Sequence, residues 1–182
     1  SLGIESGVQR LLDAVNKGIT LASIERAVKV IKDHSRIQVE GLFILGLPGE
    51  TEADSLQTIR FARGLPLDMA QFSVLIPYPG SALFDELSAK GELDTGRRLD
   101  ELGQPSAAFD PSVWSRYSSY ICFNHVEPIW VTPTLDAERL RRLQKAALRA
   151  FYLRPSQVWR QIKRVRPSNL SQMLRVAWDG FF

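Results

Sequence analysis

The sequence contains one cysteine, Cys122, and two histidines among its 182 residues. One thiol cannot form an intrachain disulfide or a four-cysteine metal site, and His34 and His125 lack the spacing of metal ligands. No apolar run approaches the length of a membrane span, and no signal-peptide pattern is present. Neither a Walker-type loop nor a GxGxxG phosphate loop occurs. We therefore expect no metal ligand in this chain, and a reducing compartment, the cytoplasm, as its location.

Charge is distributed unevenly along the chain. Residues 139–182 contain eleven Lys or Arg and one acid, Asp179, whereas residues 1–138 contain twelve basic and nineteen acidic residues. A basic tail can contact nucleic acid, an anionic membrane or an acidic neighbouring domain, or it can be a solvated helix face. Because aromatic and basic residues do not alternate in it, we expect no nucleic acid partner. Peripheral membrane or acidic-domain contact stays open.

The stretch from Val39 to Thr51 combines an apolar run with a glycine-rich turn and a helix start. The run predicts a strand from Ile37 to Leu45 that is buried on both faces, as in a parallel sheet. We expect Thr51 to cap the next helix, with Asp54 three residues on. A buried strand that ends in such a turn is the usual place of a ligand site in α/β proteins, although a plain strand-to-helix connection fits the pattern equally.

Strands and helices alternate through residues 1–91, which predicts an α/β fold of three βα units with parallel strands. The expected strands are Leu2–Ser6, Ile37–Leu45 and Met69–Ile76. The first helix is expected over residues 8–17, with Gly18 as its stop.

The pattern changes after Gly91. Residues 92–133 combine four prolines with scattered Trp, Tyr and Phe, which predicts an irregular segment that packs over the rest of the protein. Residues 134–182 are expected to form a basic helical C-terminal extension. Its long first helix starts at Thr134 or Asp136 and is broken at Pro155.

Three residues could contact a ligand: Glu5 at the predicted carboxyl edge of the sheet, Lys17 near the end of the following helix, and Ile44 in the second strand. Glu5 is the one acid in an apolar and glycine-rich strand, and it can accept hydrogen bonds from both hydroxyls of a ribose or cap the following helix. Lys17 can bind a ligand carboxylate or complement the helix C-terminus. Ile44 can present an apolar face to a ring or pack in the core. The residues alone leave both interpretations open at each position.

Several motifs follow one another in a characteristic order: Gly3-Ile4-Glu5-Ser6-Gly7, Asn16-Lys17-Gly18, Phe43-Ile44-Leu45-Gly46-Leu47-Pro48-Gly49-Glu50-Thr51, Gln71-Phe72-Ser73 and Pro77-Tyr78-Pro79-Gly80-Ser81-Ala82-Leu83. Together they resemble the second half of the radical S-adenosylmethionine (SAM) enzymes. The closer similarity is to the subgroup with an N-terminal cobalamin-binding domain, and Phe151–Pro155 also resembles the C-terminal region of that subgroup.

The resemblance implies a partial TIM-type (β/α)₆ barrel, with the three expected strands as its fourth, fifth and sixth. It also implies SAM and a [4Fe-4S] cluster as cofactors, with cobalamin in the subgroup. The cluster is held by a CxxxCxxC motif in the first half of such a barrel, and this sequence has no such motif. Because the chain also begins on strand-like residues without an initiator Met, we expect a fragment whose missing N-terminal half binds the cluster.

The resemblance assigns SAM contacts but no catalytic residue. Glu5 falls where the family places a ribose or SAM contact, and Lys17 where related enzymes place a basic residue near the SAM carboxylate. Ile44 and Gly46 match the adenine contact of the fifth strand, and Pro77 and Tyr78 follow the sixth strand near the adenine. Leu42 departs from an acid found there in a related enzyme, so that contact is lost or replaced.

The function implied by the resemblance is therefore that of a C-terminal part of a radical SAM enzyme. It would supply surfaces for SAM and a small-molecule substrate in 5′-deoxyadenosyl-radical chemistry, such as cobalamin-dependent methyl transfer or cyclisation, and would be inactive alone. An alternative of another class is a non-catalytic α/β binding or scaffold module. A third is a nucleic-acid or membrane-surface binder that uses the basic tail.

Overall fold

The computed structural model describes residues 1–93, 97–99, 105–109 and 128–162. Its elements are β1 (Leu2–Glu5), α1 (Gln9–Ala14), α2 (Leu21–His34), β2 (Glu40–Leu45), α3 (Glu52–Gly64), β3 (Met69–Val74), α4 (Ala82–Ala89), β4 (Arg97–Leu99), β5 (Pro105–Phe109), α6 (Ala137–Tyr152) and α7 (Pro155–Ile162).

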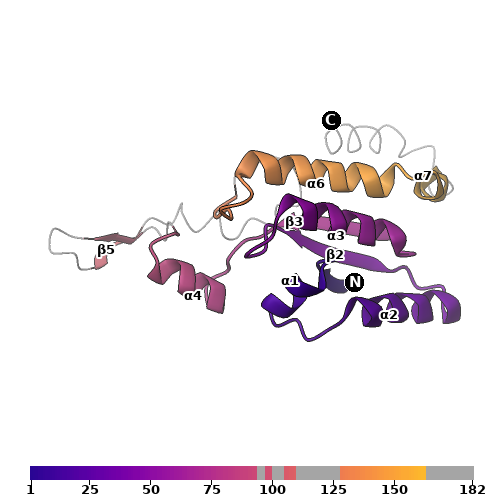
Figure 1. Ribbon diagram of the computed structural model, residues 1–182, viewed down its shortest axis with the longest axis horizontal. Helices are drawn as coiled ribbons and strands as arrows, with labels where there is room; N and C mark the ends of the chain where they lie inside the picture. Colours follow the sequence, from indigo (N-terminus) through magenta and orange to yellow (C-terminus); the bar gives the residue numbers. More distant parts are fainter. Residues whose placement is uncertain (94–96, 100–104, 110–127, 163–182) are drawn as a thin grey trace.

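The three main strands form one parallel sheet in the order β1-β2-β3. Helices connect the strands, as the sequence predicted, so the α/β class and the parallel strands are confirmed (Figure 1). Strands β4 and β5 pair antiparallel in a separate two-stranded sheet. The division into 1–91, 92–133 and 134–182 stays a prediction, because most of the middle segment and everything after Ile162 lie outside the described residues.

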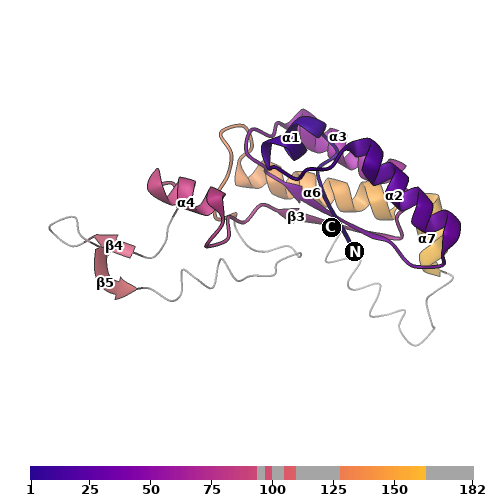
Figure 2. The same cartoon turned by 90° about the horizontal axis from the view of Figure 1, so that it is seen from below.

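The sheet is buried on one face only. Along β2, buried residues alternate with half-buried ones, and β3 begins with the same alternation. Helices α1, α2 and α3 lie together on one side of the strands (Figure 2). The expectation that the central strand is buried on both faces is therefore wrong for the part of the chain that the structure describes. Strand β2 begins at Glu40 rather than at the expected Ile37, which is exposed. Strand β3 ends at Val74 rather than at the expected Ile76.

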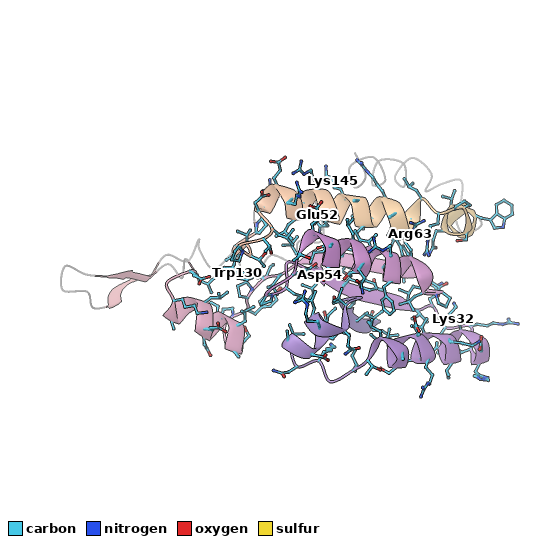
Figure 3. The ribbon with its side chains drawn as sticks, viewed as in Figure 1. Lys32, Glu52, Asp54, Arg63, Trp130 and Lys145 are labelled. Atoms are coloured by element: carbon cyan, nitrogen blue, oxygen red, sulfur yellow. The ribbon has the colours of Figure 1, made fainter. Side chains whose placement is uncertain are left out.

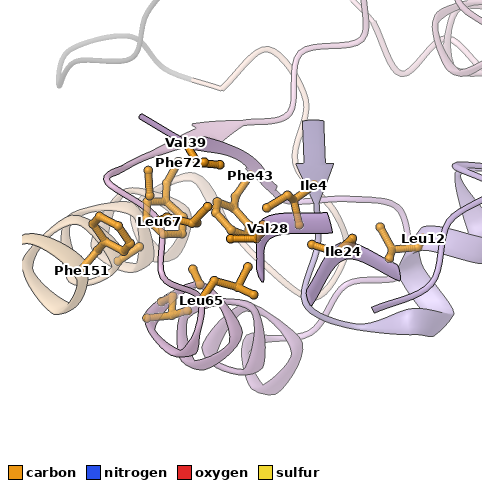
Figure 4. Close-up of a cluster of buried hydrophobic side chains, with 14 residues drawn as sticks. Ile4, Leu12, Ile24, Val28, Val39, Phe43, Leu65, Leu67, Phe72 and Phe151 are labelled. Atoms are coloured by element: carbon orange, nitrogen blue, oxygen red, sulfur yellow. The ribbon is translucent and has the colours of Figure 1, made fainter. Parts of the chain in front are cut away.

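The helix-facing side of the sheet carries the main core (Figure 4). Phe43 of β2 and Phe72 of β3 stack with their ring centroids 5.0 Å apart. Phe151 of α6 packs in the same cluster, and all three rings are almost fully buried. Burial of each ring from water stabilises the fold by about 2 kcal/mol. Residues more than 100 positions apart in the sequence thus share one core.

Helix α6 covers the free edge of β3. The Tyr152 hydroxyl donates to the carbonyl of Ala70 (3.0 Å) and accepts from its amide (3.1 Å). The Gln144 side chain donates to the carbonyl of Phe72 at 2.7 Å, and Gln157 of α7 donates to that of Leu67 at 2.9 Å. An edge strand otherwise presents unpaired backbone groups to other chains. Side chains of α6 and α7 occupy the place that another strand would take.

Helix starts follow the sequence closely. The Thr51 hydroxyl accepts from the amide of Asp54, whose carboxylate accepts from the amide of Thr51, so the expected capping box is confirmed. Asp136, one of the two expected starts of α6, caps that helix. Leu140, Leu143, Ala147 and Phe151 form the buried face of this helix.

The first helix ends earlier than expected. Helix α1 stops at Ala14, and Asn16 adopts φ +52 in the left-handed region. The Lys17 amide donates to the carbonyl of Leu12, and the Asn16 amide to that of Asp13, which together form a Schellman turn. The expected stop at Gly18 is therefore wrong, because Asn16 already supplies the left-handed residue. This turn directs Lys17 away from the helix.

Glu50 fixes the turn between β2 and α3. Its carboxylate is fully buried and accepts the amides of Gly46 and Leu47 at 2.8 Å each. The Ser55 hydroxyl donates to the other oxygen at 2.5 Å. Burial raises the pKa of the Glu50 carboxyl above its usual value of 4.5, although the bonds from Ser55, Leu47 and Gly46 oppose this shift. One side chain thus joins the end of the strand to the first turn of the helix.

We expect Tyr152→Phe to destabilise the protein by about 1–3 kcal/mol, because it removes both bonds to the backbone of Ala70 and leaves part-buried polar groups without them. Urea unfolding followed by circular dichroism measures the change. The matched control is Tyr78→Phe, since the Tyr78 side chain is exposed. Equal stabilities of the two variants would show that the edge of β3 does not depend on α6.

We expect Glu50→Gln to change the pH dependence of stability. The folded state holds the Glu50 proton more tightly than the unfolded chain, so its contribution is fully present below about pH 4.5 and is lost as the pH rises through the raised pKa. The Gln side chain keeps an acceptor for both amides and does not ionise. In urea unfolding between about pH 4 and pH 8, the variant should gain stability relative to the natural protein as the pH rises. Exposed Glu25→Gln serves as the control, and parallel profiles for Glu50→Gln and the natural protein would contradict the expectation.

Candidate functional site

Glu5 and Lys17 form an ion pair at the carboxyl end of β1. The Lys17 ammonium donates to a Glu5 carboxylate oxygen at 2.7 Å, and both side chains keep part of their surface exposed. The sequence placed these residues at the ends of two different elements, and the turn after α1 brings them together. α1 begins after Val8, which has no side-chain cap, so Glu5 is not the cap of this helix. The pair offers a cation and an anion side by side.

The backbone at Glu5 is held in an unusual conformation. Glu5 has φ +64, and the Ser6 amide donates to the carbonyl of Ile4 at 2.8 Å, which closes a three-residue turn around Glu5. The pairing of β1 with β2 is irregular between Gly3 and Glu5. A non-glycine residue with positive φ costs on the order of 1–3 kcal/mol and occurs often at ligand sites. The strand is therefore irregular at the residue whose carboxylate forms the ion pair.

Gly3 makes room for the pair. A β-carbon at Gly3 would lie 2.9 Å from the Glu5 carboxylate oxygen and 3.1 Å from the Lys17 ammonium. Both distances are shorter than ordinary contacts, so a side chain at this position would displace the charged groups. The ion pair therefore lies directly over the backbone of β1, on the face opposite buried Ile4.

The neighbouring strands complete this face of the sheet. Leu42 and Ile44 of β2 are half-buried there, and Ile44 also packs near Val8 and Leu47. In the parallel register Ile44 pairs with Ser73, whose hydroxyl accepts from the side chain of Gln71 at 3.1 Å. The face thus passes from a charged pair on β1 through apolar side chains on β2 to polar ones on β3. Such a gradient suits a ligand with a charged end and a flat ring.

Gly46 turns the chain away from this face. Its φ of +86 is accessible to glycine, and a β-carbon there would meet Leu140 of α6 at 3.2 Å. Its amide already donates to Glu50. Any contact between Gly46 and a ligand would therefore use its carbonyl or its surface rather than its N–H.

Pro77 and Tyr78 follow β3 at the same carboxyl edge of the sheet. Pro77 is buried and Tyr78 is exposed. The Tyr78 carbonyl accepts from the amide and the hydroxyl of Ser81, and Gly80 has φ +86, which is typical of a tight turn. The turn holds the two residues in place, and the Tyr78 ring is accessible from solvent.

The turn between β2 and α3 is braced from two sides. Arg10 of α1 donates to the Gly49 carbonyl and to the Asp54 carboxylate, the latter at 2.7 Å. On the other side, the Thr134 hydroxyl donates to the Glu50 carbonyl at 2.5 Å, and Arg139 of α6 pairs with Glu52. Glu52 and Asp54 project from the start of α3 (Figure 3). These bonds fix the carboxyl edge of β2 between α1 and α6.

Two features of the site could not be assigned a role from the sequence. Gly3 and Glu50 stand inside recognisable motifs, but their contacts depend on residues that the fold brings near. A lone acid in a glycine-rich turn was the available signal for Glu50.

In the part of the chain that the structure describes, no three His, Cys, Asp or Glu side chains gather as a metal site would require.

The pair has a definite binding chemistry. A Lys ammonium can donate to a carboxylate, and a Glu carboxylate can accept from an ammonium or from two neighbouring hydroxyls. A ligand that carries a carboxylate together with an ammonium or two neighbouring hydroxyls can bind Lys17 and Glu5 at the same time. Neither charge of the pair is then left without a partner. Amino acids meet this requirement, and a riboside meets it when it also carries a carboxylate.

Comparisons with known proteins find relatives for most of the chain, although no family model matches it. It is 32% identical over 153 residues to an uncharacterized methyltransferase of Pyrococcus horikoshii, which covers 84% of this chain and 28% of that protein. It is 41% identical over 93 residues to the anaerobic magnesium-protoporphyrin IX monomethyl ester cyclase of Rubrivivax gelatinosus, or 51% of this chain and 17% of the cyclase.

A third relative is the tRNA-2-methylthio-N(6)-dimethylallyladenosine synthase of Chromobacterium violaceum. The identity is 31% over 106 residues, which cover 57% of this chain and 23% of the synthase. The chain thus spans less than a third of the length of each of these three relatives. Their names describe a methyltransferase, a cyclase and a synthase. All three are members of the radical SAM family, which the sequence motifs resemble. The chain belongs to the radical SAM superfamily.

Proposed function

We propose that this chain supplies the second half of the SAM pocket in a radical SAM enzyme. Strands β1, β2 and β3 would be the fourth, fifth and sixth strands of a partial (β/α)₆ barrel, with the open face of the sheet toward the inside. The observation that carries the proposal is the Glu5–Lys17 ion pair, which lies over Gly3 at the carboxyl edge of a parallel sheet. Ligands of parallel α/β folds bind at this edge.

Each residue of the site has a role in this proposal. Lys17 binds the carboxylate of the methionine part of SAM, and Glu5 accepts from the ribose hydroxyls. Ile44 and the surface of Gly46 lie against the adenine ring, and Pro77 and Tyr78 close its far side. None of these residues performs a chemical step. They orient SAM and, with the exposed ring of Tyr78, help to shape the space for a small-molecule substrate.

The [4Fe-4S] cluster would be bound by another part of the protein, since a chain with one cysteine cannot supply three thiolate ligands. When bound, the cluster supplies the electron that cleaves SAM and starts radical chemistry. We therefore propose that the active enzyme includes a further N-terminal half, that this chain alone is inactive, and that the whole protein acts in the cytoplasm.

Methyl transfer is the reaction class that we favour. The match to the methyltransferase extends over 84% of this chain, whereas the match to the cyclase covers 51%. The longer match includes more of the chain than the sheet and its helices alone. A cobalamin cofactor, as in the subgroup that the motifs resemble, would fit methyl transfer and is part of this proposal. Cyclisation is the second candidate.

The test uses the longest open reading frame that contains this chain, purified with its cluster. We expect Lys17→Met and Glu5→Gln to weaken SAM binding by about tenfold to a hundredfold each, because each removes one charge-assisted bond to the ligand. Equilibrium dialysis with radiolabelled SAM measures the dissociation constants. Gly3→Ala keeps both charges but displaces them, and it should weaken binding less, by about threefold to tenfold.

The control for these variants is Lys29→Met. Lys29 pairs with Asp33 at the same 2.7 Å, but on the exposed surface of α2. This variant should bind SAM like the natural protein. Unchanged SAM binding in both Lys17→Met and Glu5→Gln would remove the proposed site. It would favour the alternative of an α/β scaffold module if the whole protein also lacked a cluster.

A further inference from the structure

The corner between α6 and α7 exposes three large apolar side chains. Leu153 is 54% exposed, Val158 38% and Trp159 60%. On α7 the Gln157 side chain is fully buried and donates to the carbonyl of Leu67. A residue two positions further lies about 200° around the helix, so Trp159 is directed away from the core. We name Leu153, Val158 and Trp159 the apolar corner.

The helices that meet at the apolar corner carry basic residues and no acid near it. The acids of α3 are in its first turn, and the one acid of α6, Glu138, pairs with Arg142 in the first turns of that helix. The last turns of α3 carry exposed Arg60 and Arg63, and Arg149 is exposed in the last turn of α6. Figure 3 shows Arg63 near the α7 end of α6, far from Glu52. The corner thus joins apolar surface to positive charge.

The one acid between α3 and β3, Asp68, does not change this balance. Asp68 is almost fully buried, where it accepts from Lys32 at 2.8 Å and from the Val39 amide at 2.9 Å. In the sequence, no Asp or Glu occurs from Arg139 to Trp178. This stretch of the sequence thus contains eleven Lys or Arg and no acid.

The chemistry of the corner fits an anionic lipid surface better than other partners. Trp at the headgroup level and aliphatic side chains just below it are typical of peripheral membrane contacts, and basic residues beside them attract anionic lipids. Nucleic acid would use the arginines and the Trp ring, but it offers nothing to Leu153 and Val158. A second copy of the chain would place positive charge against positive charge.

We propose that the apolar corner docks on an anionic membrane surface. Trp159, Val158 and Leu153 would enter the headgroup region, and Arg60, Arg63 and Arg149 would lie near lipid phosphates. No helix in the described part of the chain is long and apolar enough to cross a membrane. This proposal stands independently of the SAM site.

The site and the corner lie at opposite ends of the sheet. Leu140, near the start of α6, lies next to Gly46 after β2, whereas Tyr152, at its end, binds Ala70 near the start of β3. The helix between them spans roughly 20 Å at 1.5 Å per residue. Docking through the corner would therefore leave the carboxyl edge of the sheet accessible to ligands.

The test is sedimentation of the purified full chain with lipid vesicles. We expect it to bind vesicles that contain phosphatidylglycerol about tenfold more strongly than pure phosphatidylcholine, and less strongly as salt is added. Trp159→Ser should weaken this binding about tenfold, and Val158→Ser about twofold to threefold. The matched control is Val131→Ser, since Val131 is also 38% exposed but lies outside the corner. Arg60→Gln with Arg63→Gln should reduce the preference for anionic vesicles and leave the apolar side chains in place.

Equal binding to both kinds of vesicle, or equal binding of Trp159→Ser and Val131→Ser, would overturn the proposal. Displacement from anionic vesicles by RNA, with Val158→Ser unchanged, would assign the corner to nucleic acid instead. A loss of stability in Trp159→Ser, measured by urea unfolding, would mean that Trp159 packs within the fold. Binding by the unaltered chain and by the arginine variants then still decides whether the surface recognises anionic lipid.

Discussion

The buried Glu50 carboxylate is the interaction on which the rest of the structure depends. A charged group without water is tolerated only where hydrogen bonds replace its solvation, and two amides and one hydroxyl do so here. These donors belong to the end of β2 and the start of α3, so the carboxylate sets the direction of the turn between them. Arg10, Thr134 and Arg139 then attach α1 and α6 to the same turn.

The two edges of the sheet differ in whether their backbone groups are covered by other parts of the protein. At β3, side chains of α6 and α7 bond the backbone groups that face away from β2, so this edge is closed to another strand. At the other end of the described sheet, β1 has a strand neighbour on one side only. Any extension of the sheet would therefore occur at β1, beside the Glu5–Lys17 pair. An additional strand there would enclose the open face, as the proposed SAM pocket requires.

Local sequence patterns predicted the helices and strands well. Features that depend on contacts between residues distant in the sequence could not be predicted in the same way. Thr51 and Asp54 are three residues apart, so their capping box follows from the sequence alone. The meeting of Glu5 with Lys17 depends on the left-handed conformation of Asn16, whereas the sequence had predicted that the helix stops at Gly18. The run from Val39 to Leu45 is apolar enough for two buried faces, and only tertiary packing decides that one face stays open. The roles of Glu5, Lys17, Ile44, Gly46, Pro77 and Tyr78 stay predictions.

The direction of α6 connects the two ends of the molecule. The helix begins beside the turn that Glu50 fixes and ends where Tyr152 binds the start of β3, so one rigid element spans the sheet from the site to the apolar corner. Its buried face belongs to the core through Ala147 and Phe151, and its exposed end carries positive charge. A contact at the corner would orient the whole sheet without touching the site, because no residue of the corner contributes to the turn or to the ion pair. Positioning of the molecule and binding of its ligand can therefore change separately, although both depend on the same helix.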